Sequence, residues 1–382
     1  MILILVMTYS MLWQTQIKTP YIRQTADFLA FYTAGEIAEK DGPQYVYDQE
    51  KQLAVQERIQ GKEKEPNELL SYNHLPYLIP ILNLLSSNDY TASFMRWGFF
   101  LLTLQLISTM ILSRLIRFGE KTENLLFFIG ILLFYPTFIS ILKGQDSVIM
   151  LLGLSIFTLA FAKKKDTLAG IGLSLATVRP HIALFLAIPF LIKRRRIFWA
   201  FTVSASLLAI FSITLIGQDG TRQFVELLTI SSRGEGYYLK PEVMFNLIGI
   251  LARRLPFIAH GMLESIAWGI FGAGLLASAF LWWKSKKITF AHLGLGILFS
   301  VLTAPHLHYH DLAITVIPLL LGISIAIKKT APEKLVALPL GLAFILFINQ
   351  YLPQMYLIPY TAMFTGIFFF AKEIVNTHKK TE

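Results

Sequence analysis

The stretch KKKDTLAGIGLSLATVRPHIALFLAIPFLIKRRR (residues 163–196) determines the membrane topology that the sequence predicts. Two basic clusters flank an apolar run, and Arg179, Pro180 and His181 stand in the middle of that run. A charged side chain at mid-bilayer depth costs about 2.5–3.5 kcal/mol on insertion scales. An arginine at such a position is therefore expected to have a role that offsets this cost.

The composition indicates a polytopic membrane protein. Of the 382 residues, 54% are hydrophobic and only 15% are charged. The net charge of +10 lies in short clusters between apolar runs, as in cytoplasmic loops of membrane proteins, and does not predict a nucleic-acid partner. The chain has no cysteine, which excludes disulfides, thiolate zinc sites and cysteine nucleophiles.

Apolar runs separated by basic clusters predict the order of the membrane helices. The expected spans are residues 2–17 (uncleaved), 90–113, 124–142, 147–162, 197–216, 258–283, 288–304, 310–327, 332–350 and 355–371. Two polar segments, residues 18–89 and 217–257, are expected on the outer face. The first contains an interfacial or re-entrant piece at 74–86, and the second contains RGEGYYLKPE and the amphipathic VMFNLIGILARRL.

The opening stretch adds a short hairpin to this order. Its basic ends both predict a cytoplasmic location, so an even number of crossings must lie between them. Two helices of about 12 residues would each reach only about 18 Å, well short of a core of about 30 Å. Because Pro180 disfavours helix at Arg179, we predict a broken helical hairpin over residues 167–192 with Arg179 at its tip, lining a cavity.

The overall prediction is one all-α integral membrane domain spanning residues 1–382. It would contain about 12 membrane helices, within a range of about 10–13, if the short hairpin counts as two. Both termini are expected in the cytoplasm, and the unusual polar residues collect on the outer side.

Asp27 and Arg179 are the leading candidate site residues. Asp27 follows the first span and precedes the aromatic residues Phe28, Phe31 and Tyr32. It either caps a surface helix or acts as a general base for an acceptor hydroxyl. Arg179, with His181, either pairs with a buried acid or helix end, or recognises an anionic headgroup, since a guanidinium matches phosphate geometry.

Two further polar motifs stand at predicted turns. KGQD (residues 143–146) is compatible with an ordinary interhelical turn or with a site. APHLHYHDL carries His306, His308 and His310 at alternating positions, with Asp311 beside them. Alternating histidines can ligate a metal, but without a second cluster a polar cavity lining is favoured, so no metal or other cofactor is expected.

The order of these motifs resembles glycosyltransferase family 87, a polyprenol-phosphate-mannose-dependent mannosyltransferase-like branch of the GT-C membrane glycosyltransferases. The resemblance rests on DFLAFYTAG, YNHLPYLIPIL, GQD, RPH and AP…DL, and it covers roughly residues 20–325. Arg179 stands where the family usually has lysine before proline, and His181 stands where glutamine is common. Asn73 and His74 replace prolines after Tyr72.

The resemblance implies a GT-C-like fold in a bacterial cytoplasmic membrane and an active site on its outer face. It implies transfer of a sugar, with mannose favoured, from a polyprenyl-phosphate donor to a lipid or glycan acceptor, with inversion. Asp27 would be the catalytic base. The residues expected to bind the donor phosphate are Arg179, His181, Lys143 and Gln145. The residues expected to line the acceptor cavity are Tyr32, Tyr72, Asp146, His310 and Asp311.

A secondary transporter for an anionic solute is the alternative from another class. Arg179 at a broken helix could then serve as the counter-charge of the substrate. The chain shows no convincing internal repeat, and its outer segment after the first span is longer than a transporter needs. Both points favour the transferase.

Overall fold

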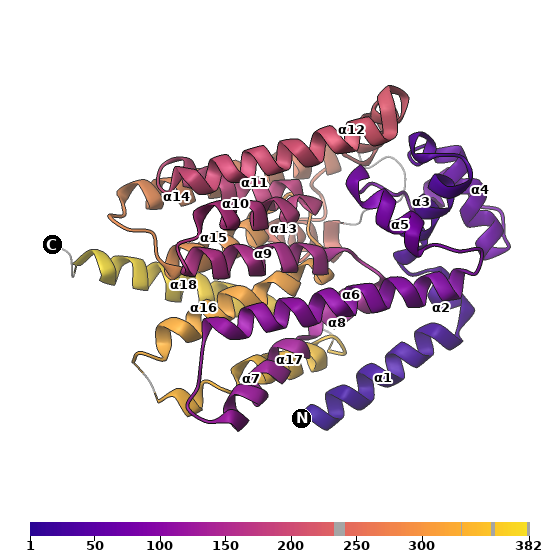
Figure 1. The fold of residues 1–382 in the computed structure, drawn as a ribbon. Coiled ribbons are helices and arrows are strands. Elements are labelled where there is room, and N and C mark those ends of the chain that lie inside the picture. Colours follow the sequence, from indigo (N-terminus) through magenta and orange to yellow (C-terminus); the bar gives the residue numbers. More distant parts are fainter. Residues whose placement is uncertain (233–240, 330, 353–355, 380–382) are drawn as a thin grey trace.

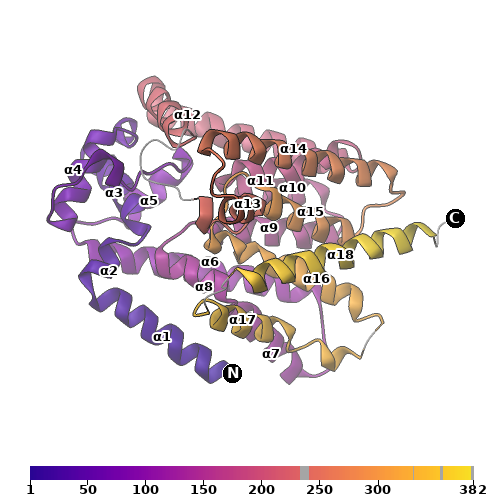
Figure 2. The same cartoon turned by 180° about the vertical axis from the view of Figure 1, so that it is seen from behind.

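The computed structural model describes residues 1–232, 241–329, 331–352 and 356–379, and these residues contain helices and no strand. The N-terminal elements are α1 (Ile2–Lys18), α2 (Pro20–Gln24), α3 (Phe28–Lys40), α4 (Gln49–Gln60) and α5 (Ile79–Leu85). Helices α2 to α5 gather at one end of a bundle of long helices, at the right of Figure 1 and the left of Figure 2. The predicted polar segment at 18–89 is therefore a helical cap on the bundle.

The bundle consists of helices that run back and forth along one direction (Figure 1). Its elements are α6 (Tyr90–Leu112), α7 (Lys121–Leu132), α8 (Tyr135–Lys143), α9 (Ser147–Ala162), α10 (Asp166–Ser174), α11 (Pro180–Ala187), α12 (Arg195–Ser232), α13 (Leu247–Arg254), α14 (His260–Lys284), α15 (Phe290–Thr303), α16 (Val316–Ala326), α17 (Leu338–Asn349) and α18 (Leu357–Lys379). The 3-10 turns η5 (Leu175–Val178), η6 (Ile188–Leu191) and η8 (Tyr309–Thr315) extend α10, α11 and α16.

Residues 166–191 contain two short helices with a break between them. Helix α10 continues through η5 to Val178, and α11 begins at Pro180. Arg179, between them, has φ −124° and ψ 85°, which is not helical. Proline restricts the residue before it and favours the first position of a new helix, so the break falls where the sequence predicts it. Helices α9, α12 and α15 pack against the hairpin, so its irregular backbone is shielded by protein.

An all-helical membrane protein is confirmed, but twelve crossings are not. Among the described residues, five helices are long and apolar enough to cross a membrane: Tyr90–Leu115, Arg195–Ile230, Gly261–Lys284, Tyr309–Ala326 and Leu357–Thr377. A sixth crossing is added if α7 and α8, bent by 43°, count as one span. Helices α9, α15 and α17 have 16, 14 and 12 residues. They are short because the chain breaks into polar turns before a full crossing is complete.

The second polar segment begins at the predicted position. The helical run α12 continues to Ser232, but it is broken at Gly217 (φ 67°, ψ −170°), so its first helix ends at residue 216 and a second helix follows. Its second half packs on the N-terminal cap, where a Cβ at Gly220 would lie 2.9 Å from the Gln44 carbonyl oxygen. The amphipathic piece forms α13 as predicted, whereas residues 233–240, most of RGEGYYLKPE, lie outside the described residues.

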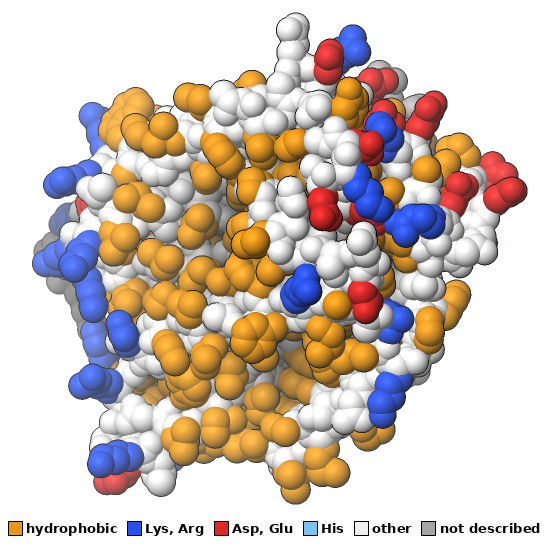
Figure 3. All heavy atoms as spheres, turned by 45° about the vertical axis from the view of Figure 1, so that its right-hand side comes forward, with side chains coloured by type: hydrophobic (Ala, Val, Ile, Leu, Met, Phe, Trp, Pro, Cys, Tyr) orange, Lys and Arg blue, Asp and Glu red, His pale blue; other side chains and the backbone are white. Residues whose placement is uncertain are grey.

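Charges divide the surface into three zones. Figure 3 shows a broad belt of hydrophobic side chains between an end rich in lysine and arginine and an end of mixed charge. Lysine or arginine follows the C-terminal end of five helices: α6, α9, α11, α14 and α16. These ends lie together, at the end of the bundle opposite α2 to α5 (Figure 1). This separation of charge along the bundle is typical of a membrane protein.

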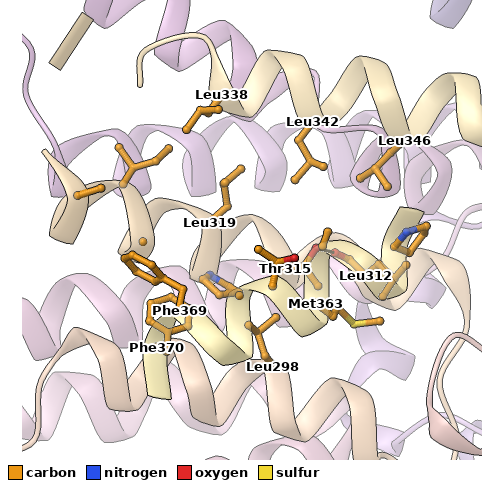
Figure 4. A pocket seen from close by; sticks show the side chains of 18 of the residues that line it. Leu298, Leu312, Thr315, Leu319, Leu338, Leu342, Leu346, Met363, Phe369 and Phe370 are labelled. Atoms are coloured by element: carbon orange, nitrogen blue, oxygen red, sulfur yellow. Dashed lines mark hydrogen bonds between the residues drawn. The ribbon is translucent and has the colours of Figure 1, made fainter. Parts of the chain in front are cut away.

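An apolar groove of about 350 Å³ runs between α15, α16, α17 and α18 (Figure 4). One end of the groove is formed by Leu312 and Leu346, and Leu338 and Phe369 lie further along it (Figure 4). Leu312 directly follows Asp311, so the groove begins beside a predicted site residue.

Candidate active site

The turn between α8 and α9 fixes one wall of the candidate site. Gly144 has φ 74°, a left-handed conformation that suits glycine, and a Cβ there would lie 2.6 Å from Cβ of Phe28. The indole Nε1 of the buried Trp97 donates a hydrogen bond of 2.8 Å to the Gly144 carbonyl oxygen. The KGQD turn therefore lies directly against the first residue of α3, next to Asp27.

Arg179 forms the centre of a buried ion-pair network. Its Nη1 lies 2.9 Å from Oδ1 of Asp146, and its Nε lies 3.0 Å from Oδ1 of Asp311. The Asp146 side chain is completely buried, the Asp311 side chain is 1% exposed and that of Arg179 is 11% exposed. The alternative in which Arg179 pairs with buried acids is the arrangement that the structure contains.

Other groups complete this network. Ser147 Oγ donates to Asp311 Oδ1 at 2.7 Å, and the His308 backbone N–H donates to Asp311 Oδ2 at 3.1 Å. His74 Nδ1 lies 2.8 Å from Asp146 Oδ2. One guanidinium therefore faces two carboxylates; His74 lies against Asp146, and His310 Nε2 lies 3.6 Å from Asp311 Oδ2. The network carries no surplus positive charge with which to bind a phosphate.

Asp27 occupies the N-cap position of α3 but does not cap that helix. Its backbone is already helical (φ −59°, ψ −21°), and its side chain makes no capping hydrogen bond. Within the described ranges of the chain, no hydrogen bond or ion pair involves its half-buried carboxylate. That carboxylate acts electrostatically on His308 and His310. The capping alternative is therefore wrong, and Asp27 is available to a ligand.

Lys143 and Gln145 lie on either side of Gly144. Lys143 is half-buried at the end of α8, and no ion pair with it exists in the part of the chain that the structure describes. The amide oxygen Oε1 of Gln145 is buried and has no hydrogen-bond partner among the same residues. The turn therefore carries one ammonium and one amide group, and its Gly144 contacts Phe28, the residue after Asp27.

The histidine motif borders the network from the other side. The rings of His306 and His308 lie 4.6 Å apart between centroids, and those of His308 and His310 lie 5.6 Å apart. Burial, followed by the charge of His310, lowers the pKa of His308 to about 4, so this ring is neutral at pH 7. No group of three potential metal-ligating side chains occurs among the described residues.

The Tyr72 ring lies 5.4 Å from that of His74 and so borders the network, whereas Tyr32 and His181 make other contacts. The Tyr32 hydroxyl donates to the Ser87 carbonyl at 2.9 Å, and the fully buried Tyr72 packs against Phe31. Both tyrosines hold the N-terminal cap together. His181 lies at the start of α11 with its ring 6.5 Å from that of Phe271, and its buried Nε2 lacks a hydrogen-bond partner among the described residues.

Sequence reasoning did not identify His74, Ser147 or Trp97 as parts of this site. Ser147 follows Asp146 directly and could have been included with the KGQD turn. His74 and Trp97 have no comparable local signal, since each is brought to the site by contacts distant in sequence.

The model of glycosyltransferase family 87 matches residues 76–305, which is more than half of the chain. The chain belongs to this family. The matched range includes Lys143, Asp146 and Arg179, whereas Asp27 and Asp311 lie outside it. A comparison with curated proteins found no match.

Family membership makes the protein a glycosyltransferase and argues against the transporter alternative. A glycosyltransferase needs a sugar donor, an acceptor, and groups that activate the nucleophile and stabilise the leaving group. Asp27, Lys143 and Gln145 form no side-chain hydrogen bond or ion pair among the described residues, unlike Asp146 of the same turn.

Proposed function

We propose that this protein is an inverting glycosyltransferase that moves a sugar, with mannose favoured, from a polyprenyl-phosphate donor to a hydroxyl of a lipid or glycan acceptor. The observation that carries the proposal is that Asp27 and Lys143, which form no ion pair among the described residues, directly precede Phe28 and Gly144, two residues in contact with each other.

Asp27 acts as the general base. Its carboxylate takes the proton of the acceptor hydroxyl while the hydroxyl oxygen attacks the anomeric carbon of the sugar. The bond from that carbon to the phosphate oxygen breaks, and its electron pair leaves with the polyprenyl phosphate. A single displacement inverts the anomeric configuration. A phosphate leaving group needs charge stabilisation rather than protonation, so the second requirement is a fixed cation.

Lys143 supplies this cation in our proposal. The sequence predicts that Arg179 binds the donor phosphate with help from His181, Lys143 and Gln145, but the Arg179 guanidinium already faces Asp146 and Asp311. Lys143 has no competing carboxylate among the described residues, and the Gln145 amide lies beside it. Arg179 then acts indirectly, by keeping the two carboxylates and the segments that carry them in place.

The apolar groove supports a lipid donor. It starts at Leu312, the residue after Asp311, and continues past Leu319 to Leu338 and Phe369, between α16, α17 and α18 (Figure 4). A prenyl chain in such a groove would exchange lipid contacts for protein contacts at little cost, while its phosphate remained at the polar end.

The positive-inside rule supports an outer-face reaction. The basic clusters follow α6, α9, α11, α14 and α16, at the end of the bundle away from α2 to α5. Because basic clusters face the cytoplasm, this end is assigned to the cytoplasm. Asp27 belongs to the opposite end of the bundle, with α3. In a bacterial cytoplasmic membrane this arrangement would put the reaction on the outer face.

The test uses purified protein in liposomes with radiolabelled polyprenyl-phosphate mannose and a membrane lipid extract as acceptor. We expect label in a new product whose anomeric configuration is opposite to that of the donor. Glucose and arabinose donors, tested in parallel, define the sugar. Absence of transfer from all three donors would refute a polyprenyl-phosphate-dependent transferase, and a retained configuration would refute single displacement.

A further inference from the structure

The segment before α13 is joined to the loop that carries the histidine motif. The Phe245 backbone N–H donates to the Leu307 carbonyl oxygen at 3.1 Å. The side-chain Nδ2 of Asn246 donates to the Ala304 carbonyl oxygen at 2.8 Å. These two bonds hold the loop on both sides of His306, just before His308.

Asn246 has two separable roles. Its Oδ1 accepts the Gly249 N–H at 2.8 Å and caps α13, while its Nδ2 points to Ala304. The side chain is completely buried. Because one atom caps the helix and the other holds the loop, a substitution can remove the second contact and keep the first.

The segment is itself fixed to α18, so it can act as a rigid support. Arg253 stacks on the ring of Tyr356 at 3.7 Å, and its Nη2 donates to the Tyr360 hydroxyl at 2.6 Å. The Tyr360 hydroxyl in turn donates to the Asn246 carbonyl oxygen at 3.0 Å. Movement of Asn246 would therefore require several contacts to break together.

We propose that Asn246 is a positioning residue for the transfer reaction: its Nδ2 fixes the Ala304 carbonyl and thereby the placement of His308, His310 and Asp311 opposite Asp27. The inference rests on the proposed function. It assigns to the second polar segment a role in catalysis that does not require contact with the substrate.

The test compares Asn246→Ser with the wild type in the transfer assay. Serine is as good an N-cap as asparagine, but its side chain is too short to reach Ala304. A misplacement of about 1 Å can cost about 100-fold in rate, so we expect kcat of the folded protein to fall at least about 10-fold while the donor KM changes little. The unfolding temperature should also fall, because the Ala304 carbonyl oxygen loses its buried partner. Asn246→Asp, which keeps the cap and replaces the donor by an acceptor, should give the same loss of kcat.

Asp48→Ala is the matched control. It removes the cap of α4, where the Asp48 carboxylate accepts the Lys51 N–H at 3.1 Å, and should lower stability without lowering kcat. A folded Asn246→Ser protein with wild-type kcat would overturn the inference and leave the proposed function intact. A wild type that transfers no sugar would overturn the proposed function, and the inference with it.

Discussion

Nη1 of Arg179 lies 2.9 Å from Oδ1 of Asp146, and this ion pair joins the tip of the short hairpin to the start of α9. Both residues stand where a helix is interrupted, and both side chains are almost entirely shielded from solvent. The pair, extended by Asp311, therefore connects three irregular stretches of backbone through charge. It is the main support beneath the candidate active site.

Replacing Arg179 should destabilise the protein more than it affects donor binding. Arg179→Gln leaves Asp146 and Asp311 buried without their counter-charge, and breaking a buried pair typically costs about 3–5 kcal/mol in the free energy of unfolding. Arg179→Lys keeps the charge but loses the planar fork, so a smaller loss is expected. Thermal unfolding in detergent micelles measures both.

Arg196→Gln is the control, because Arg196 is exposed and its Nε donates to the Thr167 hydroxyl at the surface. An Arg179→Gln protein that unfolds at the wild-type temperature but shows a raised donor KM would instead make Arg179 a phosphate ligand, as the sequence first suggests.

Lys143→Gln should weaken recognition of the donor phosphate. A hydrogen bond to a charged group contributes about 1.5–3 kcal/mol, which corresponds to a loss of roughly 10- to 100-fold in kcat/KM. Lys143→Arg should recover most of this loss. Kinetics over a range of donor concentrations provide the measurement, with Lys121→Gln at the exposed start of α7 as the control. Equal kcat/KM in Lys143→Gln and the wild type would remove Lys143 from the site.

A larger side chain in the apolar groove should exclude a long prenyl chain. Gly322 lines the groove, with Phe369 and Phe370 carbons 3.8 Å from a Cβ placed on it, so Gly322→Leu fills the space. We expect a higher KM for a long-chain donor and an unchanged KM for a short-chain analogue.

Gly341→Leu on α17 is the matched control, because a Cβ there meets nothing within 4 Å and Gly341 does not line the groove. The same rise in KM for both donor lengths, or in both variants, would argue that the groove does not hold the chain.

Glu36 should stabilise the N-terminal cap in a pH-dependent way. Burial disfavours its charge, but Lys40 and Arg58 outweigh that effect and lower the pKa of Glu36 below 4.5. Because the pKa is lower in the folded state, the stabilisation is complete above pH 4.5 and disappears as the pH falls further. The difference in stability between wild type and Glu36→Gln should therefore be constant from about pH 6 to 8 and shrink in acid. Glu63→Gln, at an exposed position, should show no such difference, and a gap that widens in acid would contradict the assignment.

The hairpin and the order of the helices were predictable because their signals are local. Pro180 directly determines the break at Arg179, and the basic clusters mark the helix ends. The number of crossings was not predictable in the same way. Whether α9 or α15 reaches across a membrane depends on where the chain stops to form the polar network, which is a tertiary property.

The site was predictable in its residues and not in its pairing. Asp27 and Arg179 were each recognisable from their surroundings in the sequence, whereas Lys143 belonged to a motif that was equally compatible with an ordinary turn. The ion pairs of Arg179 with Asp146 and Asp311 form only when three distant parts of the chain come together. No periodicity or spacing in the sequence predicts these pairs. That pairing moves the phosphate-binding role from Arg179 to Lys143 in our account.

The rate of sugar transfer by Asp27→Asn, measured with radiolabelled polyprenyl-phosphate mannose in liposomes, tests the central claim most directly. Asparagine is nearly isosteric but cannot accept the hydroxyl proton. Since the Asp27 side chain has no hydrogen bond or ion pair among the described residues, the variant should fold like the wild type. We predict a loss of about 100-fold or more in kcat at unchanged unfolding temperature. Transfer at the wild-type rate by folded Asp27→Asn would contradict the account.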